Sequence, residues 1–109
     1  MDFQELSRRA LEIREQYRAY EQQKYGASWS NIELALGFVG DVGDLVKLVM
    51  AVNERRSIPA AHQKLAHELA DCLWSVIVLA NVHGINLEEA FLKTMDDLES
   101  WIKNDGVVG

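Results

Sequence analysis

Two segments in the middle of this chain are apolar on nearly every side. Residues 45–52 read LVKLVMAV, and residues 72–80 read CLWSVIVLA. A helix that is hydrophobic all round is buried all round, and in a chain of 109 residues two further helices cannot enclose two such helices. We therefore expect an obligate homo-oligomer, either a homodimer or a dimer of dimers, that shares these two helices in its core.

Helices account for most of the chain, because one proline and seven glycines leave few places for them to end. The expected helices cover about residues 2–25, 29–55, 57 or 59 to 83, and 87–104. The expected C-caps are Gly26 and Gly84, and the expected N-caps are Ser28 or Ser30 and Asn86. The fold class is therefore all-α, with four helices in a single domain that covers residues 1–109.

Net charge and composition indicate which partners and which cellular compartment to expect. Seventeen acidic residues against eleven basic ones give a net charge of -6, which argues against a protein that adheres to nucleic-acid polymers. The single cysteine, Cys72, excludes an internal disulfide framework and fits a reducing compartment. The amino terminus carries no apolar run typical of a signal peptide, and no stretch of eighteen apolar residues lacks charge. We expect a cytoplasmic protein without a membrane partner.

The motif VGDVGDL, residues 39–45, places two glycines and two aspartates inside the second expected helix. Both residue types are poor helix formers, so helix stability alone does not explain them. Asp41 and Asp44 are three residues apart and share a helix face, and Glu68 and Asp71 repeat this spacing in the third helix. Antiparallel pairing of the two helices would bring the two acidic pairs level.

Four carboxylates that converge in an apolar bundle are costly unless other charges neutralise them. Lys47 and Lys64 would supply part of the positive charge. Magnesium would supply more, because it takes oxygen ligands and shares its coordination with substrate phosphates. Gly40 and Gly43 would then leave room for a close helix approach or for a ligand. The sequence predicts an open acidic pocket for Mg²⁺, with Mn²⁺ as the alternative ion.

The acidic pairs resemble the signature of the all-α nucleoside triphosphate pyrophosphohydrolases, which include MazG-like proteins, dimeric dUTPases and dCTP pyrophosphatase. That signature is Glu-x-x-Glu, a variable gap, and Glu-x-x-Asp. Here Asp41-Val-Gly-Asp44 is followed after 23 residues by Glu68-Leu-Ala-Asp71. VGDVGDL is similar to the GEVGEL of the dCTP pyrophosphatase-like branch, and ELADCLWSVIVLA with HGINLEEAFLKTM is similar to the second half of MazG-like domains. The resemblance covers about Trp29 to Trp101.

The resemblance implies a MazG-like bundle that hydrolyses a (deoxy)nucleoside triphosphate to the monophosphate and pyrophosphate with magnesium, in house-cleaning of the nucleotide pool. Carried over by position, the metal ligands and catalytic residues are Asp41, Asp44, Glu68 and Asp71. Lys93 matches a family lysine that contacts phosphate, and Trp101 matches an aromatic near the end of the last helix. Trp29 is a candidate stacking surface for the base, and Lys47 is a further candidate for substrate binding.

Three departures from the family pattern keep a second function open. Both acids of the first pair are aspartates, and Gly40 stands where many members carry an extra glutamate. Asp97, Leu98 and Glu99 stand where the last helix often carries an asparagine and a basic cluster. The alternative is a catalytically weak or inactive helical oligomer that acts as a nucleotide sensor or a protein-interaction module.

Overall fold

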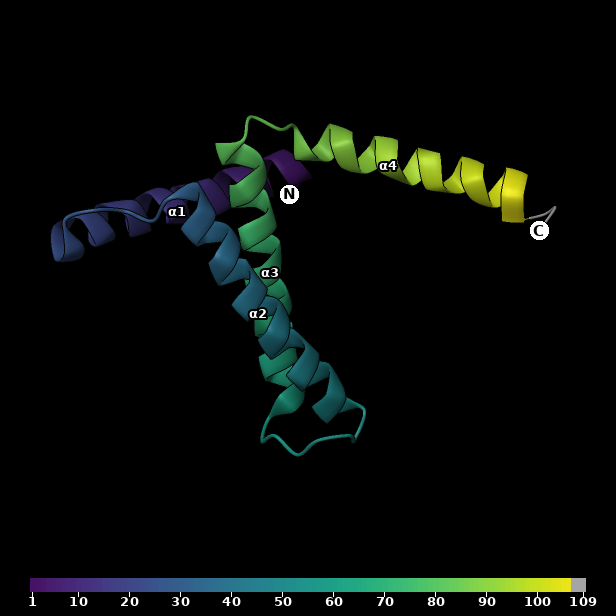
Figure 1. Cartoon of the computed structure of the whole chain (residues 1–109), viewed down its shortest axis with the longest axis horizontal. Coiled ribbons are helices and arrows are strands. Elements are labelled where there is room, and N and C mark those ends of the chain that lie inside the picture. Colours follow the sequence, from purple (N-terminus) through teal and green to yellow (C-terminus); the bar gives the residue numbers. More distant parts are fainter. Residues whose placement is uncertain (107–109) are drawn as a thin grey trace. The chain divides into compact units, whose positions relative to one another are not determined.

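A computed structural model describes residues 1–106 of the chain. Its elements are α1 (Phe3–Tyr25), α2 (Asn31–Val52), α3 (Ala61–Val82), α4 (Leu87–Trp101) and the π-helical turn η1 (Ile102–Gly106) (Figure 1). These residues contain no β-strand. The prediction of an all-α fold built on four helices is confirmed.

Local signals at the helix ends are the ones that the sequence predicts. Gly26 ends α1 with a left-handed φ of 80°, a conformation that costs glycine nothing. Ser30 opens α2 in a capping box, in which its hydroxyl accepts the Glu33 N–H while the Glu33 carboxylate accepts the Ser30 N–H. The side-chain oxygen of Asn86 accepts the Glu89 N–H in the first turn of α4. Gly84 follows α3 with a φ of 67°, and the N–H groups of Gly84 and Ile85 donate to carbonyls of the last turn, so the expected caps at all four positions are observed.

The connection between α2 and α3 differs from the expectation. The helix α2 ends at Val52 rather than near Arg55, and α3 begins at Ala61. Glu54 and Ala60 adopt φ values of 63° and 53°, which the interior of a right-handed helix excludes. The expected boundaries of the second and third helices were therefore wrong at this connection.

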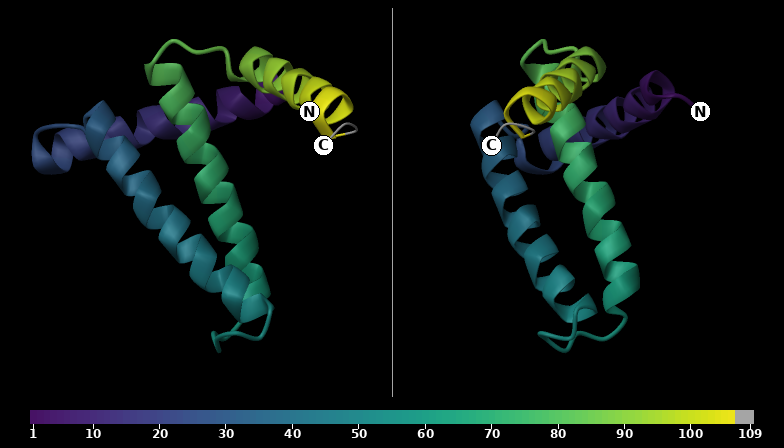
Figure 2. Two further views of the ribbon diagram at one scale, coloured as in Figure 1. Left: turned by 45° about the vertical axis from the view of Figure 1, so that its right-hand side comes forward. Right: turned by 90° about the vertical axis from the view of Figure 1, so that its right-hand side faces the viewer.

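Contacts along the chain form two units, Met1–Leu79 and Ala80–Gly109, and each is described by itself. The first unit holds α1, α2 and most of α3; the second holds the end of α3 with α4 and η1. In the first unit, α2 and α3 lie side by side and run antiparallel as a hairpin (Figures 1 and 2). A single domain over residues 1–109 stays a prediction, and residues 107–109 lie outside the described part.

The helix α1 is fixed to α3 through Trp74. The indole N–H of Trp74 donates to the Ala10 carbonyl oxygen at 2.9 Å. The ring centroids of Trp74 and Tyr17 lie 5.6 Å apart at an interplanar angle of 45°. The Trp74 ring is half-buried, and its polar atom has a hydrogen-bond partner, as is usual for a tryptophan at such a position.

A buried ion pair within α1 also holds the connection that leads to α2. The Arg14 guanidinium donates to the Glu21 carboxylate at 3.1 and 3.4 Å, and both side chains are about nine-tenths buried. The second Glu21 oxygen also accepts the backbone N–H of Trp29 at 3.0 Å. Burial alone would raise the pKa of Glu21, but the hydrogen bond from Trp29 and the charge of Arg14 hold that pKa below its ordinary value. We call these three residues the Arg14 clamp.

Few apolar side chains are buried within one chain. Among the described residues, the buried apolar ones are Leu48, Cys72, Ile77, Val78 and Ala80. On α2, by contrast, Ile32, Leu36 and Val39 are exposed over 71%, 65% and 67% of their surface. A surface with so many apolar residues is typical of an interface rather than of a solvated face.

The helix α3 is also long and apolar enough to cross a membrane, by length and composition alone. It is the one such helix within residues 1–106, with a mean hydropathy of 1.4 over 18 residues, of which 17% are buried. The expectation from the sequence required eighteen apolar residues without any charge, whereas this stretch of α3 contains Glu68 and Asp71. Core helices of soluble proteins pass the same test, so the absence of a membrane partner stays a prediction.

Candidate functional site

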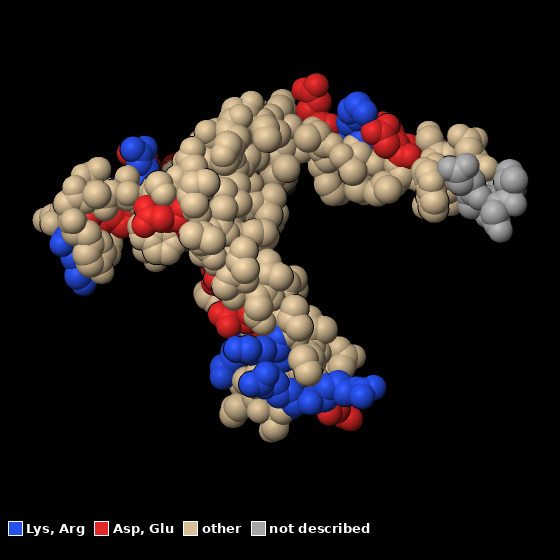
Figure 3. All heavy atoms as spheres, in the orientation of Figure 1, with Lys and Arg blue, Asp and Glu red and all other residues tan. Residues whose placement is uncertain are grey.

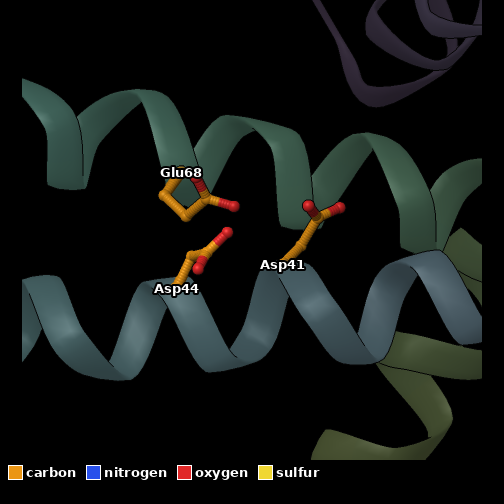
Figure 4. Close-up of side chains that lie close together, drawn as sticks. All are labelled: Asp41, Asp44 and Glu68. Atoms are coloured by element: carbon orange, nitrogen blue, oxygen red, sulfur yellow. The ribbon is translucent and has the colours of Figure 1, made fainter.

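Three carboxylates meet between α2 and α3. Asp41 and Asp44 project from α2 and Glu68 from α3, into the space between the two helices (Figure 4). Each of the three offers one oxygen atom, and these oxygens all lie within 4.8 Å of one another. The spacing of the two aspartates puts them on one helix face, and the antiparallel hairpin brings Glu68 opposite them. We call these residues the carboxylate cluster.

The Glu68 carboxyl group has an unfavourable environment in the absence of a cation. Its Oε1 atom is buried and has no hydrogen-bond partner among the described residues. Burial, and then the negative charges of Asp41, Asp71 and Asp44, raise its pKa above the ordinary value. A buried, unpaired carboxylate oxygen is costly, and a hard divalent cation with oxygen ligands would relieve that cost. The chemistry of this donor set therefore fits magnesium or manganese.

Asp71 does not join the cluster. Its Oδ2 atom lies 3.2 Å from Nε2 of His67, one turn earlier on α3, and the His67 side chain is exposed. The two residues lie at the edge of an apolar groove of about 500 Å³ between α1 and α3, which Tyr17 and Trp74 also line. Asp71 is still near enough to raise the pKa of Glu68 by its charge. The structure thus brings together three of the four acids that the sequence pairs predict.

The glycines of the motif at residues 39–45 face open space. A Cβ atom added to Gly40 or Gly43 would meet nothing within 4 Å among the described residues. A close approach of two helices within one chain therefore does not explain why glycine stands at these two positions. The space beside them remains open to a ligand or to a second chain. Among the glycines that the structure describes up to Gly84, Gly37 has the close neighbour, because its Cβ would lie 2.8 Å from Cζ3 of Trp29. No sequence signal separates Gly37 from the others.

The aromatic ring of Trp29 therefore packs on α2 close to the aspartates. Gly37, Asp41 and Asp44 have the spacing i, i+4 and i+7, so they share one face of α2. The ring, which is half-exposed, lies over Gly37, one turn before Asp41. This places one predicted substrate-binding residue beside the carboxylate cluster.

An open cavity of about 440 Å³ adjoins the cluster on its other side. Its lining residues are Asp44, Lys47, Leu48, Ile58, Gln63, Lys64, His67 and Glu68. Two of them, Asp44 and Glu68, belong to the carboxylate cluster, so the cavity and the cluster are continuous. Lys47, a predicted substrate-binding residue, faces this cavity together with Lys64, which the sequence suggested only as a neutralising charge.

A comparison with protein families matches residues 30–103 to the MazG nucleotide pyrophosphohydrolase domain. The chain belongs to the MazG family. The match includes α2, α3 and α4 with both acidic pairs, so the resemblance drawn from those pairs is confirmed. No curated protein and no solved structure matches the chain.

Two further residues expected to bind substrate lie on α4 of this MazG domain, in the second unit. The Lys93 ammonium group donates to Asp97 at 2.8 Å, and this bond with the charge of Asp97 raises the pKa of Lys93. Trp101 ends α4 with 60% of its surface exposed. Lys93 is thus engaged by an acid that stands where MazG-like proteins often carry a basic cluster. A role in substrate binding stays a prediction for both residues.

Proposed function

We propose that this MazG protein hydrolyses a (deoxy)nucleoside triphosphate to the monophosphate and pyrophosphate with Mg²⁺, or with Mn²⁺ in its place. Family membership supports pyrophosphohydrolase chemistry in general. The observation that carries the proposal is the carboxylate cluster with its buried, unpaired Glu68 oxygen. We further propose that the enzyme removes unwanted or excess nucleotides in the cytoplasm.

We assign different roles in this reaction to the acidic residues of the first unit. Asp41, Asp44 and Glu68 would hold the divalent cation, which, when bound, supplies neutralisation of phosphate oxygens and activation of water. The products require cleavage between the α- and β-phosphates, a reaction that depends mainly on positioning and charge neutralisation. Asp71 lies next to the cluster without belonging to it. It is the acid that we propose to orient or deprotonate the attacking water, with His67 holding its carboxylate.

The second candidate function is a nucleotide sensor or interaction module without turnover. Two observations favour it: the first acidic pair has short aspartate side chains, and Asp97 already occupies the Lys93 ammonium group. In this case the chain would bind nucleotide with Mg²⁺, or a partner protein, and would release no pyrophosphate.

A release assay decides between these functions. We expect pyrophosphate from at least one canonical or modified nucleoside triphosphate in the presence of Mg²⁺ or Mn²⁺, and none after chelation with EDTA. Pyrophosphate can be measured with a coupled enzymatic assay across a panel of bases and both sugars. Binding of a nucleotide without turnover would instead favour the sensor. Neither binding nor turnover across the panel would leave the interaction module.

We also propose that the exposed apolar residues of α2 and α3 are covered in a homodimer or a dimer of dimers. The small number of buried apolar side chains among the described residues supports this, since a stable domain needs a larger core. A second copy offers the same apolar faces, and closed symmetric association would remove them from water.

Leu36→Glu is expected to dissociate this oligomer. Leu36 is 65% exposed in the single chain, so a glutamate there would be solvated in a monomer but buried and unpaired in an interface. We expect the mass by sedimentation to fall to that of one chain or of a smaller assembly, at micromolar protein. Gln22→Glu, which adds the same charge to the exposed surface of α1, should keep the parent mass. A monomeric parent, or an unchanged Leu36→Glu assembly, would contradict the proposed interface.

A further inference from the structure

The basic side chains of the chain fall into two groups. Those of α1 and α4, and Lys103 just after α4, pair with an acid of the same helix or the preceding one. The exception is Lys24, which donates to the hydroxyl of Tyr20. Within residues 1–106, four cations have no carboxylate or hydrogen-bond partner: Lys47, Arg55, Arg56 and Lys64. All four lie at the closed end of the α2–α3 hairpin, where Lys and Arg side chains gather on the surface (Figure 3). We call them the hairpin cations.

Two hairpin cations lie one helical turn from the carboxylate cluster. Lys47 follows Asp44 by three residues, and Lys64 precedes Glu68 by four. Because α2 and α3 are antiparallel, both steps lead toward the closed end of the hairpin. All four residues line the same cavity of about 440 Å³. One turn corresponds to about 5.4 Å along the axis, which is comparable with the length of a triphosphate chain.

The other side of the cluster has the opposite character. There the Trp29 ring lies over Gly37, one turn before Asp41 and away from the closed end of the hairpin. The order along α2 is therefore an aromatic ring, then carboxylates, then cations. A nucleoside triphosphate has the matching order of base, α-phosphate and distal phosphates.

We propose that the hairpin cations bind the β- and γ-phosphates of the substrate and so fix its direction along α2. The base lies toward Trp29, the α-phosphate lies at the carboxylate cluster, and the distal phosphates enter the cavity of Lys47 and Lys64. Arg55 and Arg56, in the connection after α2, add positive charge at the same end of the hairpin. This inference rests on the proposed function, because it assigns a direction to the same substrate.

The charges support this direction over its reverse. A triphosphate keeps excess negative charge that one divalent cation does not neutralise, and lysine and arginine are the side chains that bind phosphate oxygens. In the reverse direction the distal phosphates would meet the Trp29 ring, while the base would meet unpaired ammonium groups. The hairpin cations also replace the basic cluster that this chain lacks after Lys93, where Asp97 and Glu99 stand instead.

The double variant Lys47→Gln/Lys64→Gln tests the direction. Its ligands are a non-hydrolysable α,β-imido nucleoside triphosphate and the corresponding monophosphate, titrated calorimetrically with MgCl₂ in excess. Hydrogen bonds between charged groups contribute enough free energy that losing two of them should lower the triphosphate affinity about tenfold or more. The monophosphate affinity should change less than twofold, because the monophosphate does not reach these lysines. Trp29→Leu should weaken both ligands by a similar factor.

Controls separate binding from folding. Lys47 and Lys64 are exposed, so the double variant should keep the far-ultraviolet circular dichroism and the mass of the parent. Lys47→Arg/Lys64→Arg should recover most of the triphosphate affinity, and Lys24→Gln, which removes a cation of α1, should leave both affinities unchanged. Equal weakening of both ligands by the double variant, or parent-like triphosphate affinity, would overturn the direction while the pyrophosphohydrolase activity stands. A parent that neither binds nor hydrolyses any nucleotide would overturn the proposed function as well.

Discussion

Glu68→Gln is expected to abolish pyrophosphate release while the chain stays folded. Glu68 is the one member of the carboxylate cluster that comes from α3, and its buried Oε1 accepts no hydrogen bond from any described residue. The amide keeps the size of the side chain but offers a neutral and weaker ligand. Loss of a residue that merely supports a metal ligand typically costs 10–100-fold, so loss of the ligand itself should cost at least about 100-fold in turnover.

In the absence of metal, Glu68→Gln should not destabilise the folded protein. Burial and the charges of three neighbouring aspartates disfavour the ionised Glu68 carboxylate in the folded state. A neutral side chain removes that repulsion, so the melting temperature in EDTA should be equal to or above that of the parent. Addition of MgCl₂ should raise the melting temperature of the parent more than that of the variant, because a ligand that binds only the folded state stabilises it.

Glu15→Gln provides the matched control for Glu68→Gln. Glu15 is an exposed acid of α1 that pairs with Arg18 at the surface, at 3.3 Å. Its change should alter turnover less than twofold and stability by less than about 0.5 kcal/mol. Parent-like turnover of Glu68→Gln, or unfolding of that variant in EDTA, would argue against a catalytic cluster and for a structural role of Glu68.

The second large effect is expected at the Arg14 clamp. Arg14→Met removes the partner of a buried carboxylate and leaves Glu21 with the Trp29 N–H alone. Breaking one side of a buried ion pair typically costs about 3–5 kcal/mol, and we expect this loss in the free energy of unfolding from urea titration. The double variant Arg14→Met/Glu21→Leu should recover much of it, because no buried charge is then left unpaired. A single variant as stable as the parent would show that the pair contributes nothing.

The pH dependence of stability follows from the same carboxyl group. The pKa of Glu21 lies below its ordinary value of 4.5 in the folded chain, so the folded state binds the proton less tightly than the unfolded state. Its contribution is therefore complete above pH 4.5 and is lost as the pH falls through the lower, folded pKa. The difference in stability between the parent and Arg14→Met should shrink over that range. A constant difference down to pH 3 would exclude Glu21 as its source.

The helices and the acidic pairs were predictable because their signals are local. Capping at Ser30 and Asn86 depends on residues within one turn, and the spacing of Asp41 and Asp44 fixes their shared face. The fate of Asp71 was not predictable in this way. Glu68 and Asp71 are also three apart, but the hairpin presents Glu68 to α2, whereas His67 holds Asp71 beside α1. Which member of a pair enters the site depends on how a helix is rotated about its axis.

The role of the glycines was not predictable for a related reason. The motif at residues 39–45 drew attention to Gly40 and Gly43, yet the close contact is made by Gly37. That contact exists because the chain before α2 folds back and lays the Trp29 ring on the helix. The Trp29 N–H donates to Glu21 of α1, so the position of the ring depends on a contact outside α2.

The Arg14 clamp also connects α1 to the base end of the proposed substrate site. The family match covers residues 30–103, so Arg14, Glu21 and Trp29 all lie before the matched segment. In our proposal, residues inside that segment hold the cation and the phosphates, whereas the backbone of Trp29, whose ring lies nearest the base, is held by Glu21 of α1. Substitutions in α1 that shift the Trp29 ring are therefore expected to change the preference among nucleobases while the carboxylate cluster stays intact.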